Sequence, residues 1–183
     1  MHAVPTDDLP LSDGVVQLRA YTLGDAEAVA AACVDPEIPR WTFMAENLTV
    51  DQASSWIEDS HRQLALATNV RLAIVGSASD AFIGQIGIGH FDWPNQRGEI
   101  YYWLAAPERH HGYTTRAVRL LTTWGFHRLG LARIELLIEP DNHASQRVAQ
   151  RAGYHHEGTL RSYQVIKNRR MDAVVYSRLA TDR

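Results

Sequence analysis

The sequence predicts a mixed α/β fold in which helices flank a sheet of about seven strands. Three observations predict it. The chain has 183 residues, 45% of them hydrophobic and 21% charged, which suits one domain with a sizeable core. Apolar residues alternate in short segments and recur at helical spacing in longer ones. The two kinds of segment are interspersed along the chain, as expected when helices pack on a mixed sheet.

The first part of the domain is expected to hold one strand and two helices. Residues 15–19 alternate apolar and polar side chains, as in a half-buried strand. A helix follows that starts at Thr22 or Asp25 and runs to Val34, before a break over Asp35-Pro36 to Pro39. The spacing Thr49-x-x-Gln52 matches a capping box and predicts the start of a second helix.

Three strands are expected next, at residues 72–75, 82–91 and 99–104. The turn-forming run Ser-Ala-Ser-Asp separates the first two strands, and Asp-Trp-Pro-Asn separates the last two. Short turns of this kind join antiparallel neighbours, so the three strands are expected to form a meander.

The last part of the chain alternates helices and strands. An amphipathic helix is expected from about Thr114 to Leu129, ending at Gly130. The elements predicted after it are a strand at 134–138, a helix from 140–142 to 152–153, and strands at 155–164 and 169–179.

One domain is expected over residues 14–183, after a loose lead over residues 1–13. The lead lacks the basic start and apolar run of a signal peptide, and no stretch approaches the roughly 20 apolar residues that span a bilayer. These features predict a cytoplasmic protein with no membrane partner. The single cysteine, Cys33, excludes an internal disulfide and leaves no cysteine cluster for zinc, and its Ala-rich surroundings favour a buried thiol.

Charge divides the chain unevenly. Residues 1–96 hold 4 basic and 13 acidic residues, for a net charge of −9, whereas residues 97–183 hold 14 basic and 8 acidic, for +6. The chain as a whole, at −3, is not a general polyanion binder, and the basic run 167–170 has no interleaved aromatics, so no nucleic acid is predicted. Either the basic part meets an anion and the acidic part a cationic acceptor, or both parts are solvated surface.

The segment Arg109 to Thr115 joins the clearest strand to the longest helix. Free backbone N–H groups and the positive end of the helix dipole make such a junction an anion site. Gly112 permits close backbone approach. The first helical turn, Thr114 to Arg116, holds no acid, unlike that of the two earlier helices. An external anion would need that arrangement, although a plain turn glycine followed by capping threonines also fits.

These residues resemble the GNAT superfamily of acetyl-CoA-dependent N-acetyltransferases. The superfamily's loop pattern is Gln/Arg-x-x-Gly-x-Gly/Ala, which Arg109, Gly112 and Thr114 occupy, Thr114 being a departure. Within the superfamily the chain resembles the RimJ/RimL-type branch, which often has glycine at the position of His110 and glutamate at that of Arg116.

Downstream motifs extend the resemblance. The branch pattern Asn-x-x-Ser, then Gly-Phe/Tyr and Glu-Gly, is met by Asn142, Ser145, Gly153-Tyr154 and Glu157-Gly158. The resemblance covers about residues 15–179. The ordered set of motifs at these spacings is far more specific than the loop alone.

The resemblance implies a strongly bent mixed sheet whose fourth and fifth strands splay apart, with acetyl-CoA in the split. It implies that the pantetheine arm pairs with backbone near the end of the fourth strand and with Asn142. The pyrophosphate would rest on N–H groups of the loop, and an arginine of the last helix would meet the adenosine phosphate. The coenzyme-binding residues implied in this way are Trp103, Leu104, Ala105, Arg109, His110, His111, Gly112, Tyr113, Thr114, Thr115, Asn142, Arg147 and Arg151.

Glu99 is the candidate base. An amine like that of lysine has a pKa near 10.4, so a base must remove its proton before it attacks a thioester. Glu99 begins the fourth strand and resembles the strand glutamate that several superfamily members use. The alternative is a strand-end glutamate that pairs with Arg97 or faces solvent. A backbone N–H of Leu104 or Ala105 would stabilise the oxyanion.

Ser145 is the candidate acid for the departing thiolate. The tyrosine that many superfamily members place seven residues after the asparagine is replaced by Ala149, and in the RimJ/RimL branch a serine like Ser145 approaches the sulfur. The alternative is a helix-start serine that satisfies a backbone N–H. Tyr154 and Tyr163 are outside candidates. No metal is expected, because the paired histidines lack ligand spacing.

The resulting prediction is an acetyl-CoA-dependent N-acetyltransferase that acts by direct attack in a ternary complex. Its acceptor is a primary amine, either a protein N-terminus or a small molecule, and the protein is a monomer or homodimer. Two alternatives remain: a GNAT-fold protein that binds or senses coenzyme A without turnover, and an acyltransferase that uses a longer acyl-CoA. By resemblance Trp41, Phe43 and Met44 border the acceptor cleft, but a core role fits each equally well.

Overall fold

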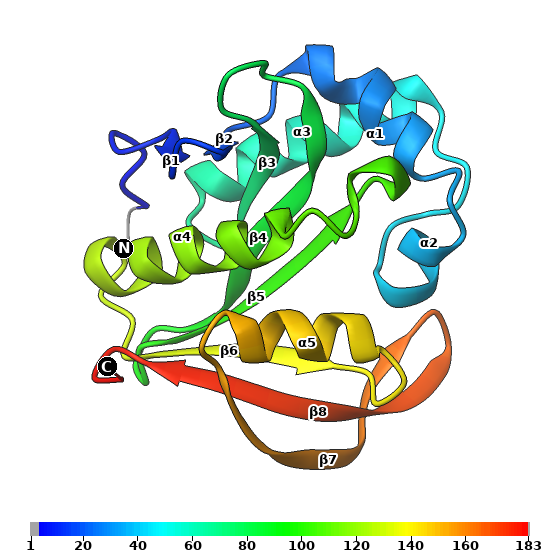
Figure 1. The fold of residues 1–183 in the computed structure, drawn as a ribbon. Coiled ribbons are helices and arrows are strands. Elements are labelled where there is room, and N and C mark those ends of the chain that lie inside the picture. Colours follow the sequence, from blue (N-terminus) through cyan, green and yellow to red (C-terminus); the bar gives the residue numbers. More distant parts are fainter. Residues whose placement is uncertain (1–3, 183) are drawn as a thin grey trace.

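The computed structural model describes residues 4–182, which form one eight-stranded mixed sheet with helices on both faces (Figure 1). The predicted mixed sheet flanked by helices is confirmed. The strands are β1 (Leu11–Ser12), β2 (Val16–Arg19), β3 (Val70–Gly76), β4 (Phe82–Asp92), β5 (Arg97–Leu104), β6 (Arg133–Ile138), β7 (His155–Ile166) and β8 (Arg169–Leu179). The helices are α1 (Ala26–Ala32), α2 (Glu37–Trp41), α3 (Val50–Ala65), α4 (Tyr113–Arg128) and α5 (His143–Arg151), with short 3-10 turns η1 (Leu23–Asp25) and η2 (Ala106–Glu108).

The sheet has the order β1-β2-β3-β4-β5-β6-β8-β7 and splits between β5 and β6. These two strands are parallel and pair only where Arg97–Glu99 meets Arg133–Glu135. Beyond Glu99 they diverge, because β5 stays paired with β4 along its whole length while β6 pairs with β8. The two strands that splay are the fourth and fifth of the predicted set.

Side chains of β5 alternate between the two faces of the sheet. Ile100 and Leu104 belong to one core cluster, together with buried residues of α4, and Trp103 belongs to the other, with α1 and α3. Figure 1 shows α4 and α5 on the near face of the sheet and α3 behind it. A residue on β5 therefore faces one set of helices or the other according to whether its number is even or odd.

Local signals explain where most helices begin. The predicted capping box of α3 is confirmed: Thr49 N–H donates to Gln52 Oε1 at 2.9 Å and Gln52 N–H to Thr49 Oγ1 at 3.2 Å. Helix α2 was not predicted, since the sequence indicated only a break there. It forms because Asp35 accepts from the N–H of Glu37 at 3.1 Å and because Pro39 lies in the first turn, where a missing N–H costs little.

Residues 4–13 of the expected loose lead are attached to the domain, and residues 1–3 lie outside the described residues. Strand β1 pairs with β2 in antiparallel register. Asp13 pairs with Arg116 on α4 at 2.8 Å, and Asp7 and Asp8 both pair with Arg128 at the other end of that helix. Apolar side chains of the segment also pack against the main core cluster.

The expected burial of Cys33 is confirmed. Cys33 is buried, and burial raises the pKa of its thiol to about 11, so the thiol is protonated at neutral pH. Lys167 and Asn168 form the tight turn between β7 and β8, with φ of 47° and 62°. Within residues 4–182, no helix has the length and apolar character needed to cross a membrane.

Candidate active site

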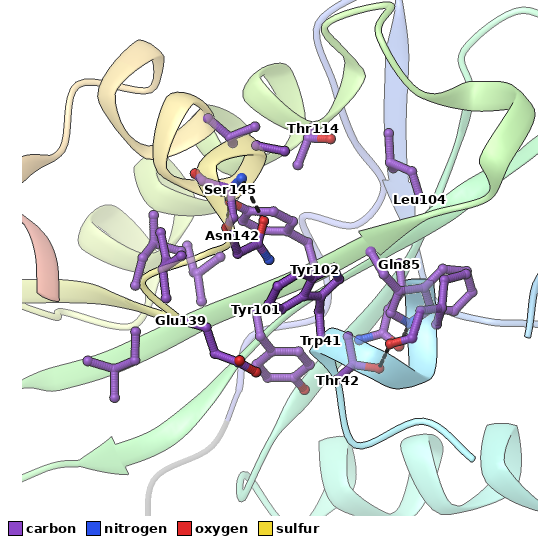
Figure 2. A pocket seen from close by; sticks show the side chains of 18 of the residues that line it. Trp41, Thr42, Gln85, Tyr101, Tyr102, Leu104, Thr114, Glu139, Asn142 and Ser145 are labelled. Carbon is purple, nitrogen blue, oxygen red and sulfur yellow. Dashed lines mark hydrogen bonds between the residues drawn. The ribbon is translucent and has the colours of Figure 1, made fainter. Parts of the chain in front are cut away.

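A cavity of about 750 Å³ lies between the diverging parts of β5 and β6 (Figure 2). That volume is in the range of small-molecule sites. Its lining comes from both faces of the sheet: the starts of α4 and α5 on one side, and α2 and α3 on the other. The predicted site residues that line it are Glu99, Trp103, Leu104, Arg109, His110, Gly112, Thr114, Thr115, Asn142, Ser145, Arg147 and Arg151; Ala105, His111 and Tyr113 do not.

The start of α4 has open space beside its backbone and no carboxylate in its first turn. Gly112 caps it in the left-handed region, with φ of 79°, and contributes no side-chain hydrogen bond to the helix start. A Cβ built on Gly112 would meet nothing within 4 Å, so the space beside this backbone is open. No acid lies in the first turn of α4 or α5, whereas α1 and α3 carry Glu27 and Asp51 there. The two helix starts that line the cavity on this face of the sheet thus carry no carboxylate of their own, whereas α2, on the other face, carries Glu37.

His110, one departure from the family pattern, keeps the backbone conformation that glycine favours. Its φ is 67°, in the left-handed region where glycine is favoured and other residues are strained. The branch commonly has glycine at this position, and His110 adopts the same backbone at a conformational cost.

Arg109 has a different role from the one expected. Its guanidinium donates to the carbonyl of Leu104 at 3.1 and 3.3 Å and pairs with Asp35. The side chain therefore ties the loop after β5 to the loop before α2. It lines the cavity, but its donors are engaged by the protein itself.

Leu104 presents its backbone N–H to the split. Gly84 and Leu104 are register partners, and Ala105 N–H donates to the carbonyl of Ile83 at 3.0 Å. In an antiparallel pair this pattern turns the N–H and C=O of Leu104 away from β4, while those of Trp103 face β4. The N–H of Ala105 is consequently not free for a ligand. Of Trp103, Leu104 and Ala105, the three residues expected to pair with the pantetheine arm, only Leu104 has a backbone N–H that faces the split.

Glu99 lies on the face opposite α4, because it alternates with Ile100. Its carboxyl has no hydrogen bond or ion pair to any residue among 4–182; Arg97, the alternative partner, pairs instead with Asp92 and Glu135. Burial, and then the charge of its register partner Glu135, raise the pKa of Glu99 to about 7. A carboxyl with that pKa can accept a proton at neutral pH.

Ser145 and Tyr102 form a hydroxyl pair on the other face. Asn142 Oδ1 accepts from the N–H of Ser145 at 3.1 Å, so the helix cap is Asn142. The Ser145 hydroxyl lies 2.8 Å from that of Tyr102, and either can donate (Figure 2). Burial raises the pKa of Tyr102. Sequence reasoning missed Tyr102, although its odd separation from Glu99 along a strand already assigns it to the face of α5.

The remaining acid candidates do not reach the cavity. Tyr154 is buried with its hydroxyl 2.6 Å from Thr122 Oγ1, and Tyr163 is exposed on β7. Neither lines the cavity. Ala149 is fully buried against the main core, so the position of the family tyrosine is filled by packing.

Aromatic side chains cover the face of Glu99. Trp41, Phe43 and Met44 all line the cavity; Met44 is buried in the second core cluster, whereas Phe43 is 72% exposed. Tyr101 also lines it, and its ring lies over Gly87, where a Cβ would come within 2.5 Å of the ring. The segment 41–44 thus contributes side chains both to the second core cluster and to the cavity wall.

The charge split of the sequence does not map simply onto this site. Asp7, Asp8, Asp13 and Asp35 pair with arginines of the basic part. Of the three carboxyls that line the cavity, Glu99 and Glu139 come from the basic part itself and Glu37 comes from the acidic part. Arg147 and Arg151, also in that part, line the cavity on α5 and their guanidinium groups pair with no residue among 4–182. Across those same residues, no group of three or more His, Cys, Asp or Glu side chains is placed to hold a metal ion.

The sequence matches a family model over much of its length. Residues 16–155 match the model described as "Acetyltransferase (GNAT) domain". Among curated proteins, the chain is 31% identical over 162 residues to one described as "Uncharacterized N-acetyltransferase p20" from Bacillus licheniformis, covering 88% of this chain and 91% of that protein.

Solved structures have the same fold. Mycobacterium smegmatis RimJ in complex with CoA-disulfide matches with a TM-score of 0.83 and 24% identity, over 93% of this chain and 86% of that one. The ribosomal-protein-S5-alanine acetyltransferase from Vibrio fischeri matches with a TM-score of 0.81 and 20% identity, over 96% and 98%. At these identities the likeness establishes the fold.

Proposed function

The chain belongs to the GNAT acetyltransferase family and is a transferase enzyme, and from that premise we propose that it moves an acetyl group from acetyl-CoA to a primary amine in a ternary complex. One observation carries the proposal. A single cavity joins two acid-free helix starts on one face of the sheet to an uncompensated carboxyl, Glu99, on the other. A polyanionic donor and an amine acceptor need these opposite environments.

The coenzyme side consists mainly of backbone. The first-turn N–H groups of α4, from Tyr113 to Thr115, fit a pyrophosphate, and the open space beside Gly112 lets it approach. We assign the further phosphate to Arg147 and Arg151, which line the cavity on α5. The pantetheine arm runs along the unpaired edge of β5, where Leu104 offers its N–H. Acetyl-CoA, when bound there, supplies a thioester carbon to the acceptor.

Glu99 acts as the base, directly or through water. It takes the proton from the ammonium so that the neutral nitrogen attacks the thioester carbon. The N–H of Leu104 donates to the carbonyl oxygen as negative charge develops there. The C–S bond then breaks, and the sulfur takes a proton from the Ser145 hydroxyl, which lies 2.8 Å from that of Tyr102. The nitrogen loses its second proton as the amide forms, and this proton returns through water to Ser145, while Glu99 releases the first proton to solvent. The N–C bond formed and the C–S bond broken balance without an enzyme-bound acyl group.

The acceptor is a protein N-terminal amine or a small amine. The likeness to a ribosomal-protein acetyltransferase favours the first, and the volume of the cavity accommodates either. Two other functions keep specific support. Arg109, engaged with Asp35, and the strained His110 suit a protein that binds coenzyme A without turnover. The cavity volume also admits a longer acyl chain.

Calorimetry and a thiol-release assay test the proposal together. Coenzyme A and acetyl-CoA are expected to bind, and free thiol is expected to appear when one of a panel of amines and peptides is added. Binding of coenzyme A without thiol release from any of them would favour the sensor. Faster release from butyryl-CoA than from acetyl-CoA would favour the longer acyl donor, and absence of binding at high micromolar ligand would refute all three.

A further inference from the structure

Glu139 is a buried carboxyl that the chemistry above does not use. It directly follows β6 and lines the cavity, with its side chain only 10% exposed. Its Oε2 accepts from Arg169 at 3.2 Å, while Oε1 is buried without a partner among residues 4–182. Buried carboxylate oxygens are nearly always hydrogen-bonded, so an unmet one in a cavity wall calls for a donor from a ligand.

The charged groups around Glu139 offset only part of the cost of burying its carboxyl. Burial raises the pKa of Glu139, the charges of Arg169 and Arg40 lower it, and that of Asp141 raises it, with a net upward shift. The side chain of Arg169 is 60% exposed, so its attraction is screened by solvent. A positively charged donor in the cavity would relieve the cost of burial that Arg169 leaves.

Glu139 and Glu99 lie on opposite sides of the split. Glu135 is the register partner of Glu99, and Glu139 is four residues farther along the chain. At about 3.3 Å per residue, Glu139 is about 13 Å beyond the level of Glu99, toward the open end of the split. The two carboxyls are therefore too far apart to hold one nitrogen, but an extended acceptor can reach both.

Aromatic groups near Glu139 also suit a cation. Figure 2 shows its carboxyl directed toward the side of Tyr101. Trp41 lines the same cavity and already has the Arg40 guanidinium 4.5 Å from the centroid of its ring. Faces of tyrosine and tryptophan attract ammonium and guanidinium groups. A buried carboxylate beside aromatic rings is a site that a neutral alkyl group would not satisfy.

We propose that Glu139 binds a second cationic N–H group of the acceptor, so that the protein selects acceptors with an ammonium or guanidinium group in addition to the amine that is acetylated. This inference rests on the proposed function, because the base and the coenzyme determine where the first amine lies. It defines the acceptor class as diamines, and peptides or amino-acid derivatives with a basic side chain.

Binding of paired amines that differ only by one terminal amino group tests the inference without turnover. The pairs are lysinamide with norleucinamide and 1,5-diaminopentane with n-pentylamine, each titrated by calorimetry into the protein saturated with coenzyme A. The dication of at least one pair is expected to bind roughly tenfold more tightly or better, as one charge-assisted hydrogen bond provides.

Three variants assign the preference to Glu139. Glu139→Gln is expected to bind both members of the pair alike, and Glu139→Asp, with a shorter charged side chain, to keep part of the preference. Asp141→Asn is the matched control: it removes a negative charge two residues away, from an exposed side chain that does not line the cavity, and should keep the preference. Unchanged affinity for coenzyme A shows that each variant is folded.

The inference is overturned if wild-type protein binds both members of each pair equally, or if Glu139→Gln keeps the preference. The proposed function fails by a different readout, the absence of thiol release. Selective binding of dications without acetyl transfer would therefore support the role of Glu139 and reject the transferase reaction.

Discussion

The two sides of the split are built from different kinds of atoms. On the coenzyme side the ligand-facing groups are mostly backbone N–H groups, positioned by Gly112, the start of α4 and the free edge of β5. On the acceptor side they are side chains, among them Glu99, Glu139 and Phe43, from three separate segments. Backbone geometry can be kept by one short motif, whereas a wall of side chains can change residue by residue. The comparison explains why the coenzyme is easier to identify than the acceptor.

The largest expected effect tests the backbone-built side. Gly112→Trp places a bulky side chain in the open space beside the N–H groups of α4 and forces a strained φ, so affinity for coenzyme A should fall roughly 100-fold or more. The matched control is Gly130→Trp at the other end of α4, which also has a positive φ of 66° and open space around it. Calorimetry measures both. Equal losses in the two variants would mean that α4 is destabilised generally and that Gly112 has no special role.

The next effect tests the side-chain-built side. Glu99→Gln should lower kcat about 100-fold, as loss of a general base does, and leave the affinity for coenzyme A unchanged. In wild type, the pKa of about 7 makes the rate rise with pH through neutrality, since only the carboxylate accepts a proton. Glu135→Gln removes the neighbouring negative charge, so the midpoint should move to lower pH. A pH–rate profile with the same midpoint in all three proteins would exclude Glu99 as the base.

Glu99 also links pH to stability. Its folded pKa is above the unfolded value of 4.5, so the native state binds more protons and stability falls as pH rises from about 4.5 to 7. Glu99→Gln lacks this cost and is expected to be the more stable protein at pH 8, by an amount on the order of 2 kcal/mol. Thermal unfolding at pH 5 and pH 8 measures the difference, which should shrink at the lower pH.

A smaller effect concerns the hydroxyl pair of Tyr102 and Ser145. Tyr102→Phe removes the hydroxyl next to Ser145 and should reduce kcat roughly tenfold with little change in KM. Tyr154→Phe is the control, because the hydroxyl of this tyrosine is also hydrogen-bonded, to Thr122, but the residue does not line the cavity. If both variants lose the same activity, the effect of Tyr102 is one of packing.

The smallest effect concerns the loop backbone alone. His110→Gly relieves a left-handed φ of 67° at an exposed position, so the free energy of unfolding should rise by about 0.5–1 kcal/mol after the entropy of glycine is subtracted. A rise in Tm of a few degrees with unchanged affinity for coenzyme A is the expected outcome. A fall in Tm would show that the imidazole makes a stabilising contact that outweighs the backbone strain.

The sequence predicted the fold and the proposed coenzyme loop more completely than the acceptor side of the cavity. Hydrophobic periodicity and capping signals such as Thr49 and Asn142 located every long element, because these signals act within one turn of the chain. The short helix α2 was missed, since Pro36 at its N-cap and Asp35, which accepts from the N–H of Glu37, looked like part of a break. The pairing of Tyr102 with Ser145 and the unmet oxygen of Glu139 depend on residues more than 25 positions apart, which no local pattern encodes.

The contacts of α4 with the first residues of the chain affect where the domain can be cut. Asp13 holds Arg116 in the first turn of α4, and Asp7 and Asp8 hold Arg128 in its last. The family match begins only at residue 16. A fragment trimmed to that boundary would lose β1 and all three aspartates, and with them the ion pairs at both ends of the helix that is proposed to bind the pyrophosphate. A recombinant fragment meant to keep full affinity for coenzyme A therefore has to retain the residues ahead of the recognisable domain.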